Sequence, residues 1–452
     1  MQRSAPLESV YQRLPPSPYA VGLLILCTFI GMGEGYDVQA MALAAPLVAK
    51  AWSLSHGSVG LLLSSSVIGQ VAGSFLLSPL GDRWGRRPSI LLGLLFAGLA
   101  TLGGAFAPDY TSLLITRVVA GLFLGLALSN TTAIAMEVVP ARWRVMAVVI
   151  VSCGLPLGGA LGGILVGRLL PDYGYAAVFY VGGFATLALF GLCAAFLPES
   201  PAMLVRKPVL RARLHRVLER LGADDLEGTE ITAGERPLRP PVAELFTAER
   251  RSATLLLWVL NFANLSLVYF FVMWLPSLFV GSGMSSSAAV VAMSMFSGSG
   301  IVGGLVLAGL LPRAGAIVTL GACYVGTIAA VLIFSTLMAG STEFYIVLAV
   351  CGALIVGSQF ALNAYVNMFY PADIRATGAG YALGAGRFGA ILAPLVGGVV
   401  LARVPSPGAA FAIGAVPAVL SLAAILGLKM ATAGPGRGPS SGLGRQGASS
   451  LS

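Results

Sequence analysis

Apolar runs of about 20 residues recur along almost the entire chain, and each is long enough to cross a hydrocarbon layer about 30 Å thick as a helix. A helix suits this environment because it satisfies its backbone hydrogen bonds within the segment. Charged residues make up only 10% of the chain, which excludes water as its main solvent. We predict twelve spans, at residues 20–48, 57–79, 88–107, 111–137, 145–170, 176–197, 253–280, 286–311, 314–339, 342–369, 376–402 and 408–429.

The spans form two groups of six, which predicts an all-α membrane protein with two six-helix bundles. The predicted parts are an N-terminal tail at 1–19, a first bundle at 20–198, a central loop at 199–252, a second bundle at 253–429 and a C-terminal tail at 430–452. The first tail is too polar for a removable signal peptide. The last tail is rich in glycine and serine and is expected to be disordered. Within the loop, residues 209–221 have the pattern of an amphipathic helix.

The positive residues follow the topology of the predicted spans. If both termini are cytoplasmic, most of the 27 lysines and arginines lie in cytoplasmic segments, whereas Lys50, Arg168 and Arg403 lie on the opposite side. This asymmetry agrees with the positive-inside rule. We therefore expect a multi-pass protein of a bacterial inner membrane with both termini in the cytoplasm. The net charge of +9 then reflects topology and does not support nucleic-acid binding.

The two halves share short sequences in equivalent loops. PARWR at 140–144, after the fourth span, has a counterpart in PADIR at 371–375, after the tenth. RWG at 83–85, after the second span, has a counterpart in RAG at 313–315, after the eighth. Both pairs have almost the same separation along the chain, which indicates a duplicated six-helix unit and two pseudo-symmetric bundles. Such repeats are typical of transporters in which one half rocks against the other around a midplane site.

Several motifs resemble those of the major facilitator superfamily. LGDRWGRR at 80–87 resembles its signature loop, RVVAG from Arg117 its conserved-arginine motif, and PESP at 198–201 its end-of-half motif. Ser78 replaces a usual glycine of the signature loop, and the second-half copy has Pro312 in place of the acid. The resemblance covers the whole membrane portion and implies twelve helices in two pseudo-symmetric bundles.

Within that superfamily, the chain resembles the aromatic acid:proton symporter family. The similar stretches are GEGYD at 33–37 with Ala45 and Pro46, the segment from Arg117 through Asn130 to Glu137, and YPADIRATG at 370–378 with GRFGAI at 386–391. Glu34 replaces an aspartate of the family, which leaves the substrate within the family open. The resemblance implies import of a small aromatic carboxylate by proton symport through alternating access.

Other functions have to be weighed against this one, because fold does not fix function. A proton-coupled drug exporter, or a transporter of a sugar or dicarboxylate, could use the same fold. An enzyme is disfavoured, since the sequence contains no metal-ligand cluster, nucleophile elbow or phosphate loop. A sensor is disfavoured because the sequence shows no added soluble domain.

Two acids inside the first span are the candidate proton carriers. An ionised side chain at the bilayer centre costs about 2.5–3.5 kcal/mol, so an acid there is interpreted as functional. Glu34 and Asp37 are three residues apart and lie on one face of a helix. Both histidines lie in loops, so proton transfer would depend on these carboxylates. The alternative is that the pair only anchors the first helix to a neighbouring arginine.

Arg387, in the eleventh span, is the candidate partner of the substrate carboxylate, because a guanidinium can bind a carboxylate through two parallel hydrogen bonds. The alternative is an internal ion pair with Asp37 or Glu34.

Arg117 could bind substrate, or it could serve helix packing or proton relay. Further candidates for the substrate site are polar or aromatic, and Asn264 occupies the position equivalent to Glu34 in the repeat. They are Asn264, Tyr269 and Trp274 in the seventh span, and Gln359, Asn363 and Asn367 in the tenth.

Charged residues at the cytoplasmic ends of the spans are predicted to form a gating cluster that opens and closes as the bundles move. They are Asp82, Arg83, Arg86, Arg87, Glu137, Arg142, Arg144 and Arg375. The alternative is that these charges set the topology, and both roles can hold at the same time. The five cysteines lie in apolar runs without metal-ligand spacing, so we expect no metal and no cofactor. The expected partners are an organic anion, protons and the lipid bilayer, and the expected state is a monomer.

Overall fold

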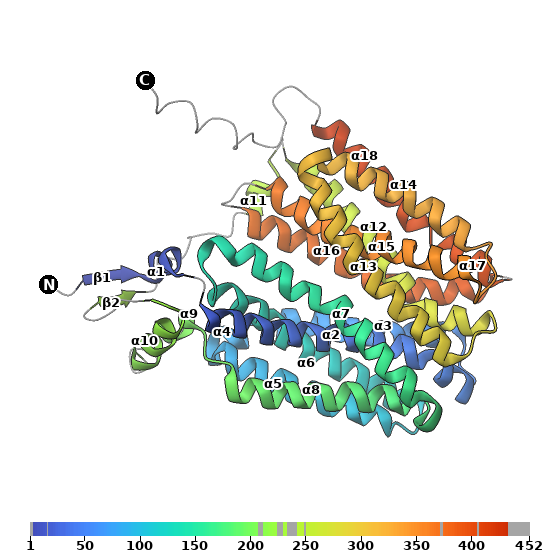
Figure 1. Ribbon diagram of the computed structural model, residues 1–452, viewed down its shortest axis with the longest axis horizontal. Coiled ribbons are helices and arrows are strands. Elements are labelled where there is room, and N and C mark those ends of the chain that lie inside the picture. The colour runs from blue at the N-terminus through green and yellow to red at the C-terminus, as the bar shows by residue number, and fades with distance from the viewer. Residues whose placement is uncertain are drawn as a thin grey trace. The chain divides into compact units, whose positions relative to one another are not determined.

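The computed structural model describes residues 3–15, 17–206, 211–223, 229–232, 242–247, 250–370, 374–404 and 406–432 (Figure 1). In these segments, twelve helices are long and apolar enough to cross a membrane, which confirms the predicted number of spans. The C-terminal tail, predicted to be disordered, lies outside the described residues from position 433 onward.

The spans of the first half begin and end within a few residues of the predicted apolar runs. They are α2 (Pro18–Ala51), α3 (His56–Leu76), α5 (Arg86–Ala105), α6 (Tyr110–Glu137), α7 (Arg144–Tyr173) and α8 (Ala176–Phe196). Shorter helices precede, connect or follow these spans along the chain. These are α1 (Leu7–Arg13), α4 (Leu80–Trp84), the 3-10 helix η1 (Ala141–Trp143), α9 (Pro201–Leu204), α10 (Arg211–Arg220) and α11 (Val242–Leu245).

The second half repeats this arrangement with one break. Its spans are α12 (Arg251–Gly281), α13 (Ser286–Ala314), α14 (Ala316–Phe334), α15 (Thr342–Phe369), α16 (Arg375–Leu401), and α17 (Pro407–Ile413) followed by α18 (Val416–Thr432). The last span, predicted as one helix at 408–429, is therefore interrupted at Gly414. A side chain there would collide with the rings of Phe270 and Phe271 of α12, so this position packs tightly against its neighbour.

Local sequence signals explain where the helices begin. The side chains of Ser17, Ser55, Asp109, Ser341 and Ser406 each accept a hydrogen bond from a backbone N–H in the first turn of the following helix.

The duplicated loop motif has a conformational basis as well. Its glycines, Gly85 and Gly315, have φ of +123° and +82° and immediately precede α5 and α14. A residue with a side chain would be strained at both turns.

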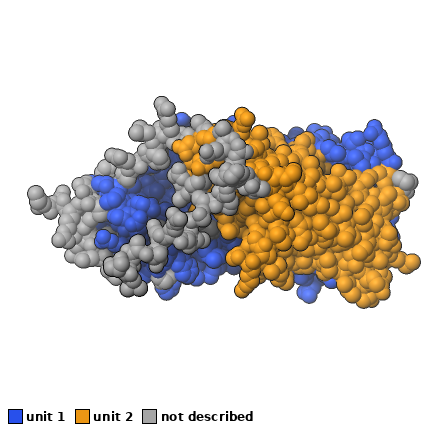
Figure 2. All heavy atoms as spheres, turned by 90° about the horizontal axis from the view of Figure 1, so that it is seen from above, with its two compact units in different colours: residues 1–236, 272–298, 394–403 blue, residues 237–271, 299–393, 404–452 orange. Residues whose placement is uncertain are grey.

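The chain forms two units, which Figure 2 shows in blue and orange. Unit 1 comprises residues 1–236, 272–298 and 394–403, and unit 2 comprises residues 237–271, 299–393 and 404–452. Helices α12, α13 and α16 thus contribute residues to both units. Within unit 1, segments from the second half contact the first: Ser297 of α13 donates to the side-chain oxygen of Gln39 at 3.3 Å. The indole of Trp274 donates to the carbonyl of Pro394 at 3.2 Å.

Glycines allow α3 and α6 of unit 1 to approach until their backbones touch. A methyl group on Gly73 of α3 would collide with the backbone of Leu122, and one on Gly121 of α6 would collide with the carbonyl oxygen of Ser66. Such small residues are what close helix packing in lipid requires. The close approach brings the polar residues of α3 next to Arg117 of α6.

The N-terminal segment and the central segment fold together, an arrangement that the sequence analysis did not predict. Strand β1 (Arg3–Pro6) pairs in parallel with β2 (Thr229–Thr232). Helix α1 buries Leu7 and Tyr11 in the same hydrophobic cluster as Leu214 and Leu218 of α10. Helix α10 lies within the amphipathic helix predicted at 209–221, whose first two residues are outside the described part of the chain.

Substituting alanine for Gly121 is expected to destabilise the protein, because the backbone carbonyl of Ser66 cannot move away as a flexible side chain would. Overpacking of this kind typically costs about 1–3 kcal/mol. The measurement is the midpoint of thermal unfolding of the purified protein. Gly191→Ala in α8 is the matched control, since its new methyl group would meet nothing within 4 Å. Equal midpoints for the two variants would contradict the packing argument.

Candidate functional site

Asp37 of α2 and Arg117 of α6 form an ion pair buried inside unit 1. The guanidinium lies 2.6 Å from Oδ1 of Asp37. The side chain of Arg117 is 0% exposed and that of Asp37 is 5% exposed. Ser66 of α3 donates to Oδ2 of Asp37 at 2.6 Å and accepts from Arg117 at 3.3 Å. Thr101 of α5 donates to Oδ1 at 3.4 Å, and the ring of Phe179 of α8 lies 5.8 Å from the guanidinium carbon. Side chains from five helices therefore surround one charge pair.

Glu34 lies one turn before Asp37 and accepts a hydrogen bond from a neutral side chain. The amide nitrogen of Gln70, on α3, donates to Oε1 of Glu34. Both side chains are buried. The sequence analysis missed Ser66 and Gln70 as members of this site. The available signal was that they are four residues apart in a predicted span, so they share one face of its helix.

The structure brings together three of the predicted substrate residues in unit 2. Oδ1 of Asn264, on α12, accepts from the hydroxyls of Tyr324 at 3.0 Å and Ser358 at 2.7 Å. Nδ2 of Asn264 donates to Gln359 at 2.7 Å, and Gln359 donates to Asn363 at 2.8 Å. This amide network runs from the fully buried Asn264 to the half-buried Gln359 and Asn363. Its outer amides can exchange hydrogen bonds with a polar group of a ligand.

The other predicted substrate residues lie elsewhere. Asn367 donates to the backbone carbonyl of Asn363 at 2.8 Å, one turn along α15. Tyr269 is buried in unit 2, whereas Trp274 is buried in unit 1 by its contact with Pro394. Arg387 is half-buried on α16 in unit 2, where the neighbouring glycines pack against α12. The anchoring of the first helix to a neighbouring arginine, one of the alternatives in the sequence analysis, is present as the ion pair of Asp37 with Arg117.

Three of the predicted gating residues meet at the ends of α5 and α6. Arg86 forms an ion pair of 2.8 Å with Glu137. Ser200 donates its hydroxyl proton to the same carboxylate. Oε1 of Glu199 accepts from the backbone N–H groups of Arg86 at 2.9 Å and Arg87 at 3.2 Å, at the positive end of α5. We call Arg86, Arg87, Glu137, Glu199 and Ser200 the charge cluster.

The remaining predicted gating residues are outside this cluster. Arg144 makes two hydrogen bonds of 2.9 Å with Glu8 of α1, and its guanidinium lies 5.0 Å from the centre of the Tyr11 ring. Arg375 donates to the carbonyl of Tyr370 at 3.3 Å. In the described part of the chain, the exposed side chains of Asp82, Arg83 and Arg142 make no hydrogen bond or ion pair. The second copy of the PARWR motif lies outside the described residues at positions 371–373.

Twelve apolar helices, a buried charge pair inside the spans and a polar network in the second half define a polytopic membrane transporter. Among the described residues, no group of three or more potential ligands could hold a metal ion. The family model of the Major Facilitator Superfamily matches residues 23–382. The chain belongs to this superfamily, so it is a transporter rather than an enzyme.

Relatives at about one-third identity transport aromatic acids. The chain is 32% identical to the gallate transporter of Pseudomonas putida, over 86% of this chain and 87% of that protein. It is 30% identical to the 4-hydroxybenzoate transporter PcaK of Acinetobacter baylyi, over 87% and 88%. It is 32% identical to the 3-(3-hydroxy-phenyl)propionate transporter of Escherichia coli, over 83% and 86%. The predicted relationship to aromatic acid transporters is confirmed.

The fold is that of solved transporters of the superfamily. The xylose transporter XylE from E. coli, in a partially occluded inward-open conformation, superposes with a TM-score of 0.70 at 15% identity. The match covers 90% of this chain and 98% of that one. At this identity the likeness concerns the fold alone, and the predicted fold class is confirmed.

Asp37→Asn is expected to destabilise the protein more than the double variant Asp37→Asn/Arg117→Gln. The single change leaves a fully buried guanidinium without its counter-ion, which costs about 3–5 kcal/mol, whereas the double change removes both charges of the pair. Thermal unfolding of the purified variants measures both. Glu8→Gln is the control, because its ion pair with Arg144 is largely exposed and such pairs contribute about 0–1 kcal/mol. A double variant as unstable as the sum of both single variants would contradict the coupling.

Proposed function

We propose that the protein imports a small aromatic carboxylate together with protons by alternating access. Superfamily membership supports transport, and the named substrates of the relatives support the class of substrate. Proton coupling rests on one observation, the buried Asp37–Arg117 pair with Glu34 one turn away. The location that we propose is a bacterial inner membrane, with both termini on the cytoplasmic side.

The charge of the substrate gives the physical reason for symport. An aromatic carboxylate is an anion at neutral pH, and moving it inward against 100 mV costs about 2.3 kcal/mol. One proton carried with each anion cancels this cost. A second proton would let the membrane potential drive uptake.

Proton binding at Asp37 changes the balance of the buried ion pair. A protonated Asp37 no longer neutralises Arg117, and a fully buried guanidinium without a counter-ion is costly. Ser66 hydrogen-bonds to both side chains, so its hydroxyl has to reorient when Asp37 becomes a donor. We infer that protonation favours a different arrangement of α2, α3 and α6, which would couple the proton to the conformational cycle.

Glu34 and Gln70 form a second position that can change its protonation state. The Gln70 amide now donates its N–H to the carboxylate. After protonation of Glu34, a rotation of the amide would present its oxygen as an acceptor. A single neighbour could therefore satisfy both states of Glu34, which suits a group that must bind and release a proton in every cycle.

For the substrate, we propose a site on the residues of unit 2. Arg387 would bind the carboxylate through two parallel hydrogen bonds. The half-buried amides of Gln359 and Asn363 would hydrogen-bond to ring hydroxyls, with Asn264 fixing their orientation. Hydroxyl groups are common to several substrates for which the relatives are named.

Uptake of labelled 4-hydroxybenzoate or gallate into cells is expected to depend on the proton gradient and to stop after addition of a protonophore. Glu34→Gln should lose accumulation against a gradient, because it cannot carry a proton. It should retain exchange of substrate across proteoliposomes, because its amide preserves a hydrogen bond with Gln70. Substrate-dependent proton influx into vesicles distinguishes import from export. Uptake that is insensitive to the protonophore would exclude proton symport.

Arg387→Lys is expected to weaken binding of the aromatic carboxylate about tenfold or more. An ammonium cannot replace the two parallel hydrogen bonds of a guanidinium, and each charge-assisted bond contributes about 1.5–3 kcal/mol. Equilibrium binding to the purified protein is the measurement. Arg313→Lys is the control, since Arg313 is exposed and bonds to its own helix at Gly309. Unchanged affinity in Arg387→Lys, with unchanged thermal stability, would contradict the assignment.

A further inference from the structure

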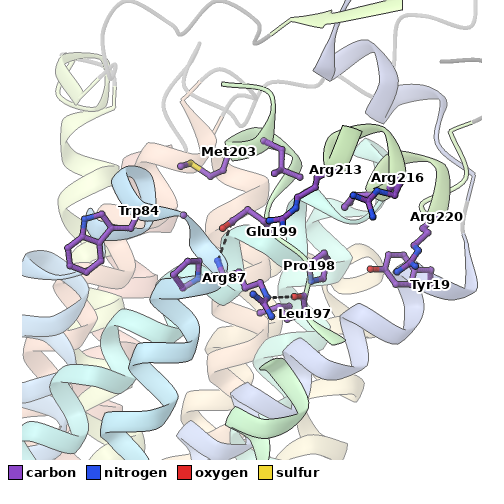
Figure 3. Close-up of a pocket in the computed structure, with 14 residues that line it drawn as sticks. Tyr19, Trp84, Arg87, Leu197, Pro198, Glu199, Met203, Arg213, Arg216 and Arg220 are labelled. Atoms are coloured by element: carbon purple, nitrogen blue, oxygen red, sulfur yellow. Dashed lines mark hydrogen bonds between the residues drawn. The ribbon is translucent and has the colours of Figure 1, made fainter. Parts of the chain in front are cut away.

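A positively charged pocket lies at one end of unit 1, where several spans begin or end (Figure 3). Its volume is about 500 Å³. Its walls include Arg213, Arg216 and Arg220 of α10, together with Arg87, Tyr19 and Trp84. Tyr19 and Arg87 are the second residues of α2 and α5, so the pocket is at the level where lipid headgroups meet these spans.

The arginines of α10 face the pocket as a row. Arg213, Arg216 and Arg220 occupy one face of the helix, while Leu214 and Leu218 are buried on the other. In the described part of the chain, Arg213 and Arg216 form no ion pair. The acidic residue in the wall, Glu199, is occupied by backbone N–H groups at the start of α5. The pocket therefore has an excess of positive charge that an anionic group could neutralise.

An apolar groove joins this pocket on the side of the spans. It has a volume of about 370 Å³ and runs between α2 and α8, and its walls include Gly22, Ile25, Phe29 and Phe196. Tyr19 lines both the pocket and the groove. Ile25 and Phe29 are 51% and 42% exposed, on a face of the spans that meets hydrocarbon in a bilayer.

We propose that the pocket and the groove together bind one anionic phospholipid, with the phosphate on Arg213 and Arg216 and one acyl chain in the groove. Basic pockets at the cytoplasmic edge of transmembrane helices attract anionic headgroups. The tyrosine and the exposed tryptophan at the rim are the side chains expected at this depth. A soluble phosphate ester could satisfy the arginines equally well, but it would leave the adjoining groove without a function.

The test uses the full-length purified protein and phosphatidylglycerol that carries a fluorophore on one acyl chain. Arg213→Gln/Arg216→Gln is expected to weaken its binding about 30-fold, the factor that corresponds to roughly 1 kcal/mol for each basic residue near a charged surface. Arg13→Gln/Arg250→Gln removes the same charge outside the pocket and should bind as the unmodified protein does. Equal binding by both double variants would overturn the proposal.

A second pair of variants separates a lipid from a soluble phosphate. Gly22→Leu should place a side chain in the groove without backbone strain, because a Cβ atom at Gly22 would meet nothing within 4 Å. We expect it to reduce binding at least tenfold, whereas Gly191→Leu, equally open and outside the groove, should leave binding unchanged. Two results together would overturn the lipid assignment and indicate a soluble ester. Glycerol phosphate would displace the labelled lipid as readily as unlabelled phosphatidylglycerol does, and Gly22→Leu would have no effect.

Discussion

A guanidinium buried inside a membrane span needs a counter-ion, and the packing around Arg117 is organised by that requirement. Asp37 supplies the charge, Ser66 and Thr101 satisfy the carboxylate oxygens, and Phe179 covers the cation. Glycines let α3 and α6 touch, which brings Ser66 of α3 within hydrogen-bonding distance of Arg117. Substitutions that separate the helices and substitutions that remove the charge should therefore disturb one shared structure, since an ion pair in a low-dielectric interior depends steeply on its geometry.

At the ends of the spans, carboxylates also bind arginine side chains and backbone N–H groups, but these groups are less buried than Asp37 and Arg117. Glu199 accepts hydrogen bonds from the first N–H groups of α5, and Glu137 holds Arg86 beside them. The turn of Gly85, with its positive φ, makes this approach possible because a side chain there would collide with Glu199. Arg87 and Glu199 also line the positively charged pocket at one end of unit 1. An anion bound in that pocket would thus be next to the groups that we predict to participate in gating.

The sequence was sufficient to predict the membrane spans but not the partners of the charges. Apolar length determines where a span lies, and the RxG repeat marks equivalent turns at Gly85 and Gly315. Which arginine meets Asp37 depends on which helices are neighbours, and periodicity within one span carries no such information. The pairing of β1 with β2 escaped prediction for a similar reason, because strands of four residues far apart in the chain have almost no local signal. By contrast, the spacing of the leucines in α10 was enough to predict this helix.

The duplicated halves have diverged at equivalent positions, and this difference has a physical consequence. Glu34 in the first half and Asn264 in the second each hydrogen-bond to a glutamine side chain, Gln70 and Gln359 respectively. A carboxyl group can exchange a proton with water at ordinary pH, whereas an amide cannot, so only the first of these two positions can change its charge. A carboxylate at Asn264 would add another ionisable group and would place a negative charge next to Gln359 and Asn363, where we propose that the anionic substrate binds. Under the function that we propose, an amide at this position keeps the hydrogen-bonding capacity without repelling the substrate, and leaves the proton chemistry to the half that contains Asp37 and Arg117.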